Sequence, residues 1–381
     1  MITMLDRLAA LELADRPRRS DARRLVPMAG VPNVPMAEHV VEAATRAAAS
    51  VFRRDSRGAP ALRAALAGHL GAEFGLDVDP ARELLITHGA QHGMSVALRA
   101  LLAPGAEVVI PAPTYFFDGM VRMAGARPVY VPAARRAGWA TDVEAVAGAI
   151  TDATRAILLC NPNNPTGHVP SADELARLVH LAAQHDLVVF SDESYARYVH
   201  DGPGYLPLQS LRERHPHLVT VTSLSKNYAF SNWRVGYVHA PAHLLQAIHR
   251  AFEWDAINVG EVPQAAALAV ITGPQEWLDI IYARFRDRRD LLQTSIETAG
   301  LTAVRPAAGV FTFADLTATG MQGRALEDLL LHHGVAGIAG NAFHGPATHA
   351  RLLYGGTEDS LIEVGRRLAD LVAETVSSAS A

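Results

Sequence analysis

The sequence has little cysteine, no strong excess of one charge and no long apolar run. Its single cysteine, Cys160, excludes an internal disulfide and a zinc site built from several cysteines. The 34 basic and 39 acidic residues are spread along the chain and give a formal net charge of −5, which argues against a nucleic-acid partner. No apolar run approaches the roughly 18 residues of a membrane span. These absences favour a globular protein of a reducing compartment.

The N-terminal segment shows no targeting signal. Its first thirty residues mix Asp6, Glu12 and Asp15 with several arginines and lack the apolar core of a signal peptide. We therefore expect a cytoplasmic protein without a membrane anchor. A hydrophobic content of 49% and a charged content of 19% are close to globular averages, and 381 residues suggest a large domain with a smaller one, or two comparable domains.

Most of the chain alternates between predicted strands and helices. A capping box at Ser171 to Glu174 starts one helix, after which apolar residues recur at helical spacing. Apolar runs that predict strands lie at 84–87, 107–110, 128–131, 156–159, 187–190, 218–222 and 235–239. Strands that are apolar on both faces, with helices between them, predict an α/β fold with a mostly parallel sheet covered on both sides.

The pattern changes from about Trp277 onward. A long charged helix is followed by strand candidates near Val304 and at 310–313, and by a closing helix with one apolar face. This part predicts a smaller α+β domain. We therefore expect a large domain over residues 46–280, and a small domain that combines residues 281–381 with 1–45.

The most informative stretch for chemistry is Ser223-Leu224-Ser225-Lys226, which Arg234 follows eight residues later. A lysine directly after a strand lies at a sheet edge, where α/β proteins place their ligands. Lysine is one of the few side chains that forms an imine with an aldehyde, and it must first lose its proton. Arg234 can favour that loss and can also hold a phosphate. Taken alone, a lysine in this position is more often an ordinary surface residue.

Other polar residues also follow predicted strands. Asp192 comes after the strand at 187–190, with Tyr195 three residues later; the pair suits a protonated ring nitrogen, or alternatively a helix cap beside a packed tyrosine. Asn164 lies in an Asn-Asn-Pro-Thr-Gly turn after another strand. Gly89 to Gln91 opens a helix, where free N–H groups suit a phosphate.

The order and spacing of these motifs resemble the class I/II aminotransferase family of fold-type I pyridoxal-phosphate enzymes over essentially the whole chain. The separations from Asp192 to Lys226 and from Lys226 to Arg234 both fit the family pattern. The resemblance implies a fold-type I architecture, pyridoxal 5′-phosphate as cofactor, amino acids and keto acids as substrates, and a homodimer with shared active sites. It also implies that Lys226 holds the cofactor through a Schiff base and later acts as general base.

The resemblance implies specific contacts around the cofactor ring. Asp192 pairs with the ring nitrogen, and Tyr115, in Pro113-Thr114-Tyr115, stacks on the ring face. Asn164 and Tyr195 hydrogen-bond the ring hydroxyl. The implied catalytic residues are therefore Lys226, Asp192 and Tyr195.

The cofactor phosphate and the substrate have their own implied contacts. The residues that hold the phosphate are a helix start and the neighbours of the lysine, namely Gly89, Ala90, Gln91, Ser223, Ser225 and Arg234. Arg351 matches the arginine that binds the substrate carboxylate. Gly30 and Asn164 line the same substrate pocket.

Two positions depart from the family pattern. The family usually has a tyrosine five residues before the glycine matched by Gly58, where it reaches the phosphate of the neighbouring subunit; Arg53 stands there in this chain. An arginine can bind the same phosphate. His344 lies in an unusual loop before Arg351, either as a pocket residue or as a solvated loop histidine.

The reaction type is less closely determined than the cofactor. The implied reaction moves an amino group between an L-amino acid and a 2-keto acid, but the same scaffold also hosts lyases, cyclases and oxidases. The substrate side chain is open as well. Asp255 or Glu261 would suit a basic substrate, and the alternative is that both are ordinary loop charges.

Overall fold

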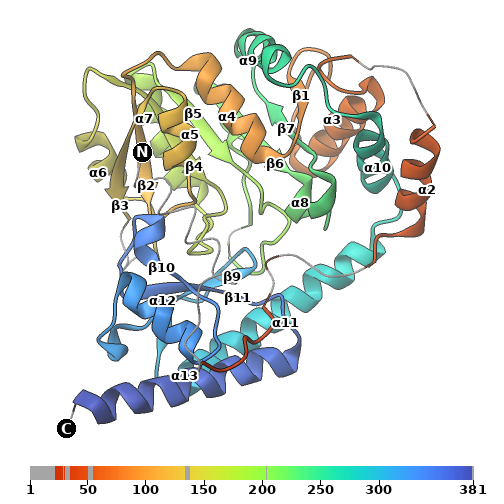
Figure 1. The fold of residues 1–381 in the computed structure, drawn as a ribbon. Coiled ribbons are helices and arrows are strands. Elements are labelled where there is room, and N and C mark those ends of the chain that lie inside the picture. The colour runs from red at the N-terminus through yellow and green to blue at the C-terminus, as the bar shows by residue number, and fades with distance from the viewer. Residues whose placement is uncertain are drawn as a thin grey trace.

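Two sheets of unequal size organise the chain (Figure 1). The computed structural model describes residues 22–28, 30, 35–49, 55–133, 138–202 and 204–379, with side chains as far as residue 375. No helix in these ranges is both long and apolar enough to cross a membrane.

The larger sheet has seven strands in the order β1-β7-β6-β5-β4-β2-β3, and only β7 runs antiparallel to its neighbours. The strands are β1 (Leu84–Thr87), β2 (Glu107–Ala112), β3 (Arg127–Pro132), β4 (Thr154–Cys160), β5 (Val188–Asp192), β6 (Leu218–Ser223) and β7 (Gly236–His239). Each lies within two residues of a predicted strand. The mostly parallel sheet of the prediction is therefore confirmed.

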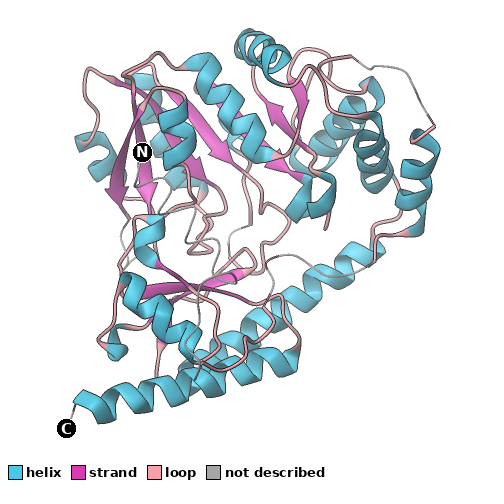
Figure 2. Cartoon of the chain, viewed as in Figure 1, coloured by secondary structure: helices cyan, strands magenta, loops and turns pink. Residues whose placement is uncertain are grey.

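Alternate residues of the central strands enter two separate apolar clusters. In β4, Ala156 and Leu158 belong to the cluster of α4 (Ala90–Leu101), whereas Ile157 and Leu159 belong to that of α7 (Ala172–Gln184). Side chains of a strand alternate between the faces of the sheet, so helices must cover both faces, as Figure 2 shows. Ser171 caps α7 as predicted, because its Oγ accepts a hydrogen bond from Glu174 N at 3.1 Å. The second half of the capping box is not formed, since the Glu174 carboxylate instead accepts from Thr141 N at 2.8 Å and lies 2.9 Å from His168 Nε2.

The remaining helices around the large sheet connect its strands or pack at its edge. They are α2 (Glu38–Ala47), α3 (Pro60–Phe74), α5 (Asp118–Met123), α6 (Val143–Gly148), α8 (Leu224–Asn227), α9 (Ala242–Asp255) and α10 (Glu261–Thr272). Both α2 and α3 pack against α10. The two helices that precede β1 in the chain therefore pack on α10, a helix at the large sheet.

The smaller sheet has four antiparallel strands in the order β10-β11-β9-β8. Its elements are β8 (Thr302–Ala303), β9 (Phe311–Asp315), β10 (Ile338–Ala339), β11 (His349–Leu353), α11 (Glu276–Thr298), α12 (Gly323–His332) and α13 (Glu358–Ala379). The long helix α11 runs from the large sheet's helices to this sheet, where α13 packs on it (Figure 1). The α+β character expected for this part is confirmed, whereas the boundaries at 46–280 remain a prediction.

Candidate active site

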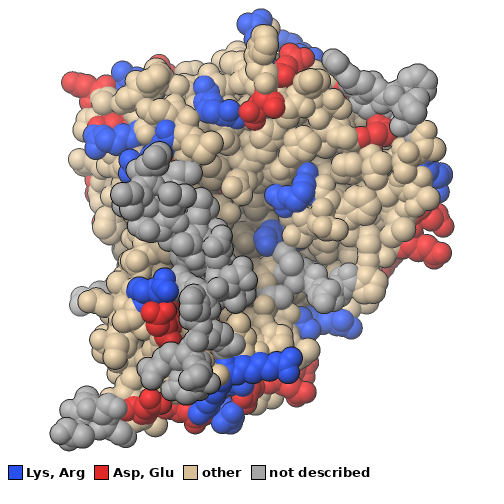
Figure 3. All heavy atoms as spheres, in the orientation of Figure 1, with Lys and Arg blue, Asp and Glu red and all other residues tan. Residues whose placement is uncertain are grey.

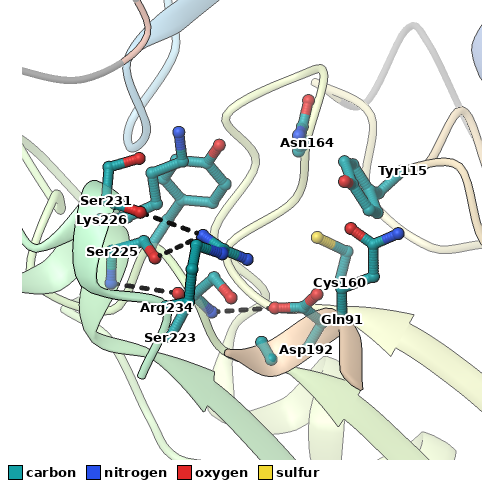
Figure 4. Close-up of a pocket in the computed structure, with 13 residues that line it drawn as sticks. Gln91, Tyr115, Cys160, Asn164, Asp192, Ser223, Ser225, Lys226, Ser231 and Arg234 are labelled. Carbon is teal, nitrogen blue, oxygen red and sulfur yellow. Dashed lines mark hydrogen bonds between the residues drawn. The ribbon is translucent and has the colours of Figure 1, made fainter. Parts of the chain in front are cut away.

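Side chains from several strand ends meet at one edge of the large sheet. Parallel strands place their carboxyl ends together, and α/β proteins bind ligands there. The edge encloses a cavity of about 240 Å³ (Figure 4), lined by Ala90, Gln91, Tyr115, Cys160, Asn164, Asp192, Ser194, Tyr195, Ser223, Ser225, Lys226, Ser231 and Arg234. Basic side chains lie around a hollow at the centre of this face of the molecule (Figure 3).

Two glycines bring the start of α4 close to the strands. Gly89, the residue before the helix, has φ 82°, and a Cβ there would lie 2.9 Å from an Arg234 nitrogen. A Cβ on Gly236 would lie 2.6 Å from the Thr222 carbonyl and 2.8 Å from Ala90 N. Ala90 and Gln91, in the first turn of α4, line the cavity, and the N–H groups of a first helical turn have no partner within the helix. They suit an anion.

The same end of the cavity carries two serines and an arginine. Ser223 Oγ accepts from Ser225 N at 3.1 Å, and Arg234 Nη1 donates to Ser225 Oγ at 3.0 Å and to the Ser231 carbonyl at 3.2 Å (Figure 4). Arg234 forms no ion pair with any carboxylate in the described residues. A helix start, two hydroxyls and an uncompensated guanidinium form a suitable donor set for a phosphate group.

Lys226 projects into the cavity from α8, the short helix directly after β6. Its Nζ donates to the Gly30 carbonyl at 3.3 Å. Burial, followed by the nearby charges of Arg351 and Arg234, lowers the pKa of Lys226 to about 8. A substantial share of this amine is therefore neutral in mildly alkaline solution, and a neutral amine is a nucleophile and a base. Lys226 is also the only lysine in the sequence.

Asp192 is a buried carboxylate at the end of β5. Burial raises its pKa, and the neighbouring Ser194, whose backbone N–H donates to Asp192 Oδ1 at 3.0 Å, opposes that rise. No cation pairs with it among the residues that the structure describes. A buried carboxylate without a cation is costly, so this group suits a bound molecule that presents a cationic N–H.

Arg351, on β11, lies behind Asn164 rather than in the cavity lining. Its Nη1 donates to Asn164 Oδ1 at 3.0 Å, and its guanidinium carbon lies 4.8 Å from the ring centre of Phe343 and 5.9 Å from that of Phe116. Its Nε is buried without a hydrogen-bond partner, and burial lowers the pKa of the side chain. Within the described part of the chain, no carboxylate pairs with Arg351. It is therefore available to a carboxylate from outside.

These groups fit pyridoxal 5′-phosphate. The phosphate suits the helix start and Arg234, the aldehyde suits Lys226, and a protonated ring nitrogen would supply the cation that Asp192 lacks. The structure thus brings together nearly all of the residues that the resemblance assigned. Gly89 and Gly30 do not line the cavity themselves. Gly89 lies against Arg234, and the Gly30 carbonyl accepts the hydrogen bond from Lys226.

Three other predictions have different outcomes. Arg53 lies outside the described residues. His344 stacks on Tyr130 with 15° between the ring planes, and neither ring lines the cavity. Asp255 pairs with His92 at 2.9 Å and with Arg99 at 2.8 Å, which supports the reading of Asp255 as a structural charge.

Sequence reasoning missed Cys160, Ser194 and Ser231 as lining residues. Cys160 and Asp192 are register partners on adjacent strands, so the position of Asp192 already indicated its neighbour. Ser194 lies between two assigned residues. The strongest signal that was missed is the sequence's use of a single lysine, which alone singles out Lys226.

Comparisons with known proteins agree with this geometry. The family model described as aminotransferase class I and II matches residues 29–368. The chain is 34% identical to a probable aspartate/prephenate aminotransferase of Thermus aquaticus over 94% of this chain and 93% of that protein. It is 35% identical to an arginine–pyruvate transaminase of Pseudomonas aeruginosa, over 85% of this chain and 83% of the relative.

Solved structures are similar over almost the full length. An aspartate aminotransferase from Thermus thermophilus with maleate superposes with a TM-score of 0.88 and 32% identity, over 97% of this chain and 96% of that one. For an N-succinyldiaminopimelate aminotransferase from Mycobacterium tuberculosis, the TM-score is 0.85 and the identity 31%, over 97% of both chains. The chain therefore belongs to the class I and II aminotransferase family, and it is a pyridoxal-phosphate-dependent aminotransferase that transfers amino groups between amino acids and 2-keto acids.

Proposed function

We propose that Lys226, Asp192 and Tyr195 are the catalytic residues and that Arg351 binds the substrate carboxylate. When bound, pyridoxal phosphate supplies an aldehyde that joins the amino group and a ring that accepts electrons from Cα. The observation that carries the proposal is the Lys226 amine, whose pKa is about 8, in a cavity with an unpaired buried carboxylate.

Lys226 has two tasks in this proposal. Its Nζ would hold the cofactor through the aldehyde carbon. Once the substrate amine has taken its place, the neutral Nζ would remove the proton from the substrate Cα and return it to that former aldehyde carbon. Arg351 lies near enough to lower the pKa of Lys226. A substrate carboxylate held bidentately by Arg351 is therefore brought toward Nζ, while Gly30 and Asn164 line the substrate's position.

The other side chains hold the ring and the phosphate. Asp192 pairs with the ring nitrogen, and Tyr115 stacks on the ring. Asn164 and Tyr195 bond the ring hydroxyl; burial raises the pKa of the Tyr195 phenol, which therefore keeps its proton and can donate it. The proposed phosphate ligands are Gly89, Ala90, Gln91, Ser223, Ser225 and Arg234.

We also infer a homodimer with shared active sites, in the cytoplasm. Trp254 is 93% exposed and Ile257 is 51% exposed, although both are large apolar residues. Asp255, between them, pairs with His92 and Arg99 of α4, whose start lines the cavity. A second copy on this surface would cover the apolar side chains beside the cavity. Light scattering of native protein and of Trp254→Glu tests this inference: a native monomer would contradict it.

Reduction of the holoenzyme with borohydride tests the role of Lys226. The cofactor should become fixed to the peptide that contains Lys226, and the absence of other lysines makes the mapping unambiguous. Lys226→Arg keeps the positive charge but cannot form the imine, so it should yield no labelled peptide and no transamination. A label on the N-terminal amine of the native protein, or transamination by Lys226→Arg, would contradict the assignment.

A further inference from the structure

The helix α8 carries Lys226 and is too short to fix its own orientation. It spans only Leu224–Asn227, and a single hydrogen-bonded helical turn is not stable by itself in water. Its position at the cavity therefore depends on contacts with other segments. We propose that Asn227 is a positioning residue that fastens α8 to the turn of residues 193–197 and so holds the Lys226 amine in the cavity. The inference rests on the proposed role of Lys226.

The Asn227 side chain bridges the two ends of this turn. Its Oδ1 accepts a hydrogen bond from the Arg197 backbone N–H at 3.2 Å, and its Nδ2 donates to the Glu193 carbonyl at 3.5 Å, a longer and weaker contact. A backbone N–H only donates and a carbonyl only accepts, so a primary amide satisfies both ends, whereas an apolar side chain satisfies neither. Both bonds therefore depend on the identity of residue 227.

The shorter of these bonds, from the Arg197 N–H, contributes most to the argument. Asn227 is 2% exposed, so water does not readily take the place of its side chain. In the described residues, the Arg197 N–H has no other acceptor. Removal of the amide leaves this donor unpaired against a buried side chain, which costs more than the bond itself contributes. The turn and α8 must then shift relative to each other.

Both segments joined by Asn227 supply residues of the site. Lys226 directly precedes Asn227. Asp192 directly precedes the turn, and Tyr195 lies within it. All three line the cavity, where Figure 4 shows Lys226 and Asp192. Because Asp192 ends β5 and pairs within the large sheet, the turn has a fixed start. The turn is therefore the anchor, and α8 is the segment that it holds.

A neighbouring contact also holds α8, but it does not depend on the Asn227 side chain. Tyr282 Oη, on α11, donates to the Asn227 backbone carbonyl. The Arg197 guanidinium carbon lies 5.1 Å from the ring centre of Tyr228 and 5.6 Å from that of Tyr282. A substitution at position 227 leaves these groups in place, so α8 should remain packed on the protein and shift only slightly. Substitutions of Asn227 therefore test the side-chain amide.

Gln209 provides a matched control at the other end of β6. It is also 2% exposed, and its Nε2 donates to the Leu218 carbonyl at 2.9 Å and to the His239 carbonyl at 3.0 Å. Leu218 begins β6, whereas α8 follows the last residue of that strand. Gln209→Met removes a buried amide and leaves the contacts of α8 intact. An effect that it shares with Asn227→Leu is a general consequence of losing a buried amide.

The test measures how the reactivity of Lys226 depends on pH in the cofactor-free, full-length protein. An amine reagent modifies the only lysine of the chain, and peptide mapping separates this product from the modified N-terminus. Burial and the charges of Arg351 and Arg234 lower the native pKa to about 8. Asn227→Leu keeps both arginines but releases α8, so the amine gains contact with water, and its pKa should rise by roughly one unit. Gln209→Met should keep the native profile.

Turnover of the holoenzyme gives a second readout. With the amino acid that the native enzyme converts fastest, Asn227→Leu should lower kcat by about tenfold or more, because the base is displaced from the substrate Cα. KM should change little, since Arg351 remains in place to bind the substrate carboxylate. Gln209→Met should keep the native kcat.

The outcomes separate this inference from the proposed function. Melting temperatures establish that the variants fold, and Asn227→Ala, which introduces no bulk, replaces Asn227→Leu if that variant is unfolded. A native pH profile or a native kcat in the folded Asn227 variant, or an equal shift in Gln209→Met, would overturn the role of Asn227. Borohydride reduction of the native holoenzyme is the companion measurement. Absence of a label on Lys226 would remove the proposed role of the lysine, whereas normal labelling beside a native profile in the variant would reject only the inference about Asn227.

Discussion

Arg289 is buried and Arg351 is half-buried, and the surroundings of these two arginines are opposite. The Arg289 side chain is 1% exposed; its Nε donates to Asp290 Oδ1 at 2.7 Å, and its Nη1 pairs with Asp201. Burial alone would lower the pKa of Arg289, but these carboxylates raise it. Arg351 has an amide oxygen and aromatic rings around it, and burial lowers its pKa.

The contrast distinguishes a structural cation from a binding cation. Arg289 Nη1 also donates to the Pro306 carbonyl, so this arginine fastens α11 to the loop before β9. Its charge is balanced within the protein. The charge of Arg351 is not balanced in the described residues, and an unpaired charge away from water is costly until a ligand pairs with it. An uncompensated arginine beside a cavity is therefore a better indication of a substrate site than burial itself.

The largest expected effect comes from replacing Arg351, and it falls on substrate binding. Arg351→Ala should lower kcat/KM for the cognate amino acid by roughly 100-fold or more, because the carboxylate loses a charged bidentate partner in a site of low polarity. The affinity for pyridoxal phosphate should change little, since the proposed phosphate site is at the other end of the cavity. Steady-state kinetics and cofactor titration measure the two quantities. Early cofactor loss with unchanged substrate affinity would contradict the assignment.

The second expected effect is on stability, and it should fall on Arg289. Arg289→Met removes the buried partner of Asp201 and Asp290. Both carboxylates keep Arg305 as a partner, and their side chains are 48% and 43% exposed, so we expect a loss of only about 2 kcal/mol. Arg351→Met removes an unpaired charge and should leave the stability unchanged or raised. Melting temperatures of both holoenzymes test whether Arg289→Met is the more destabilising change. An equal loss of stability in Arg351→Met would contradict this prediction.

The smallest expected effect concerns the pKa of Lys226. Arg351 is one of the charges that lower this pKa, and Arg289 is not, so Arg351→Met should raise it above about 8 by less than about one unit. Removal of a neighbouring positive charge favours the protonated amine, which then persists to higher pH. The rate at which an amine reagent modifies the only lysine of the cofactor-free protein, followed against pH, reports this value. Arg289→Met is the control, and it should give the native profile.

Much of the fold follows from local patterns. The seven strands of the large sheet coincide with short apolar runs, because a strand covered on both faces favours apolar side chains at most of its positions. The short strand β10 carries no comparable pattern, whereas β8, also of two residues, lies beside the strand predicted near Val304. Both strands depend on pairing with β9 and β11, whose partner residues lie 11 to 13 positions further along the chain.

The site could be predicted where a residue type and its place after a strand carry the chemistry. Lys226, Asp192 and Arg234 belong to this group; the occurrence of a single lysine, which also singles out Lys226, was not used in the prediction. Ser194 and Cys160 were not predicted, because serine and cysteine are common buried residues whose role depends on which group they contact. Their contacts with Asp192 arise from the turn after β5 and from the register of β4 and β5.

The sequence by itself determined the strand and helix order, the family and the identity of the imine-forming residue, since these depend on residue types at fixed separations along the chain. The tertiary structure alone decided which charges are balanced. Arg289 and Arg351 are the same residue type, and only long-range packing gives one of them Asp201 and the other Asn164. Electrostatic compensation depends on distances of a few ångströms between segments remote in sequence, and such distances follow from the packing of the whole molecule.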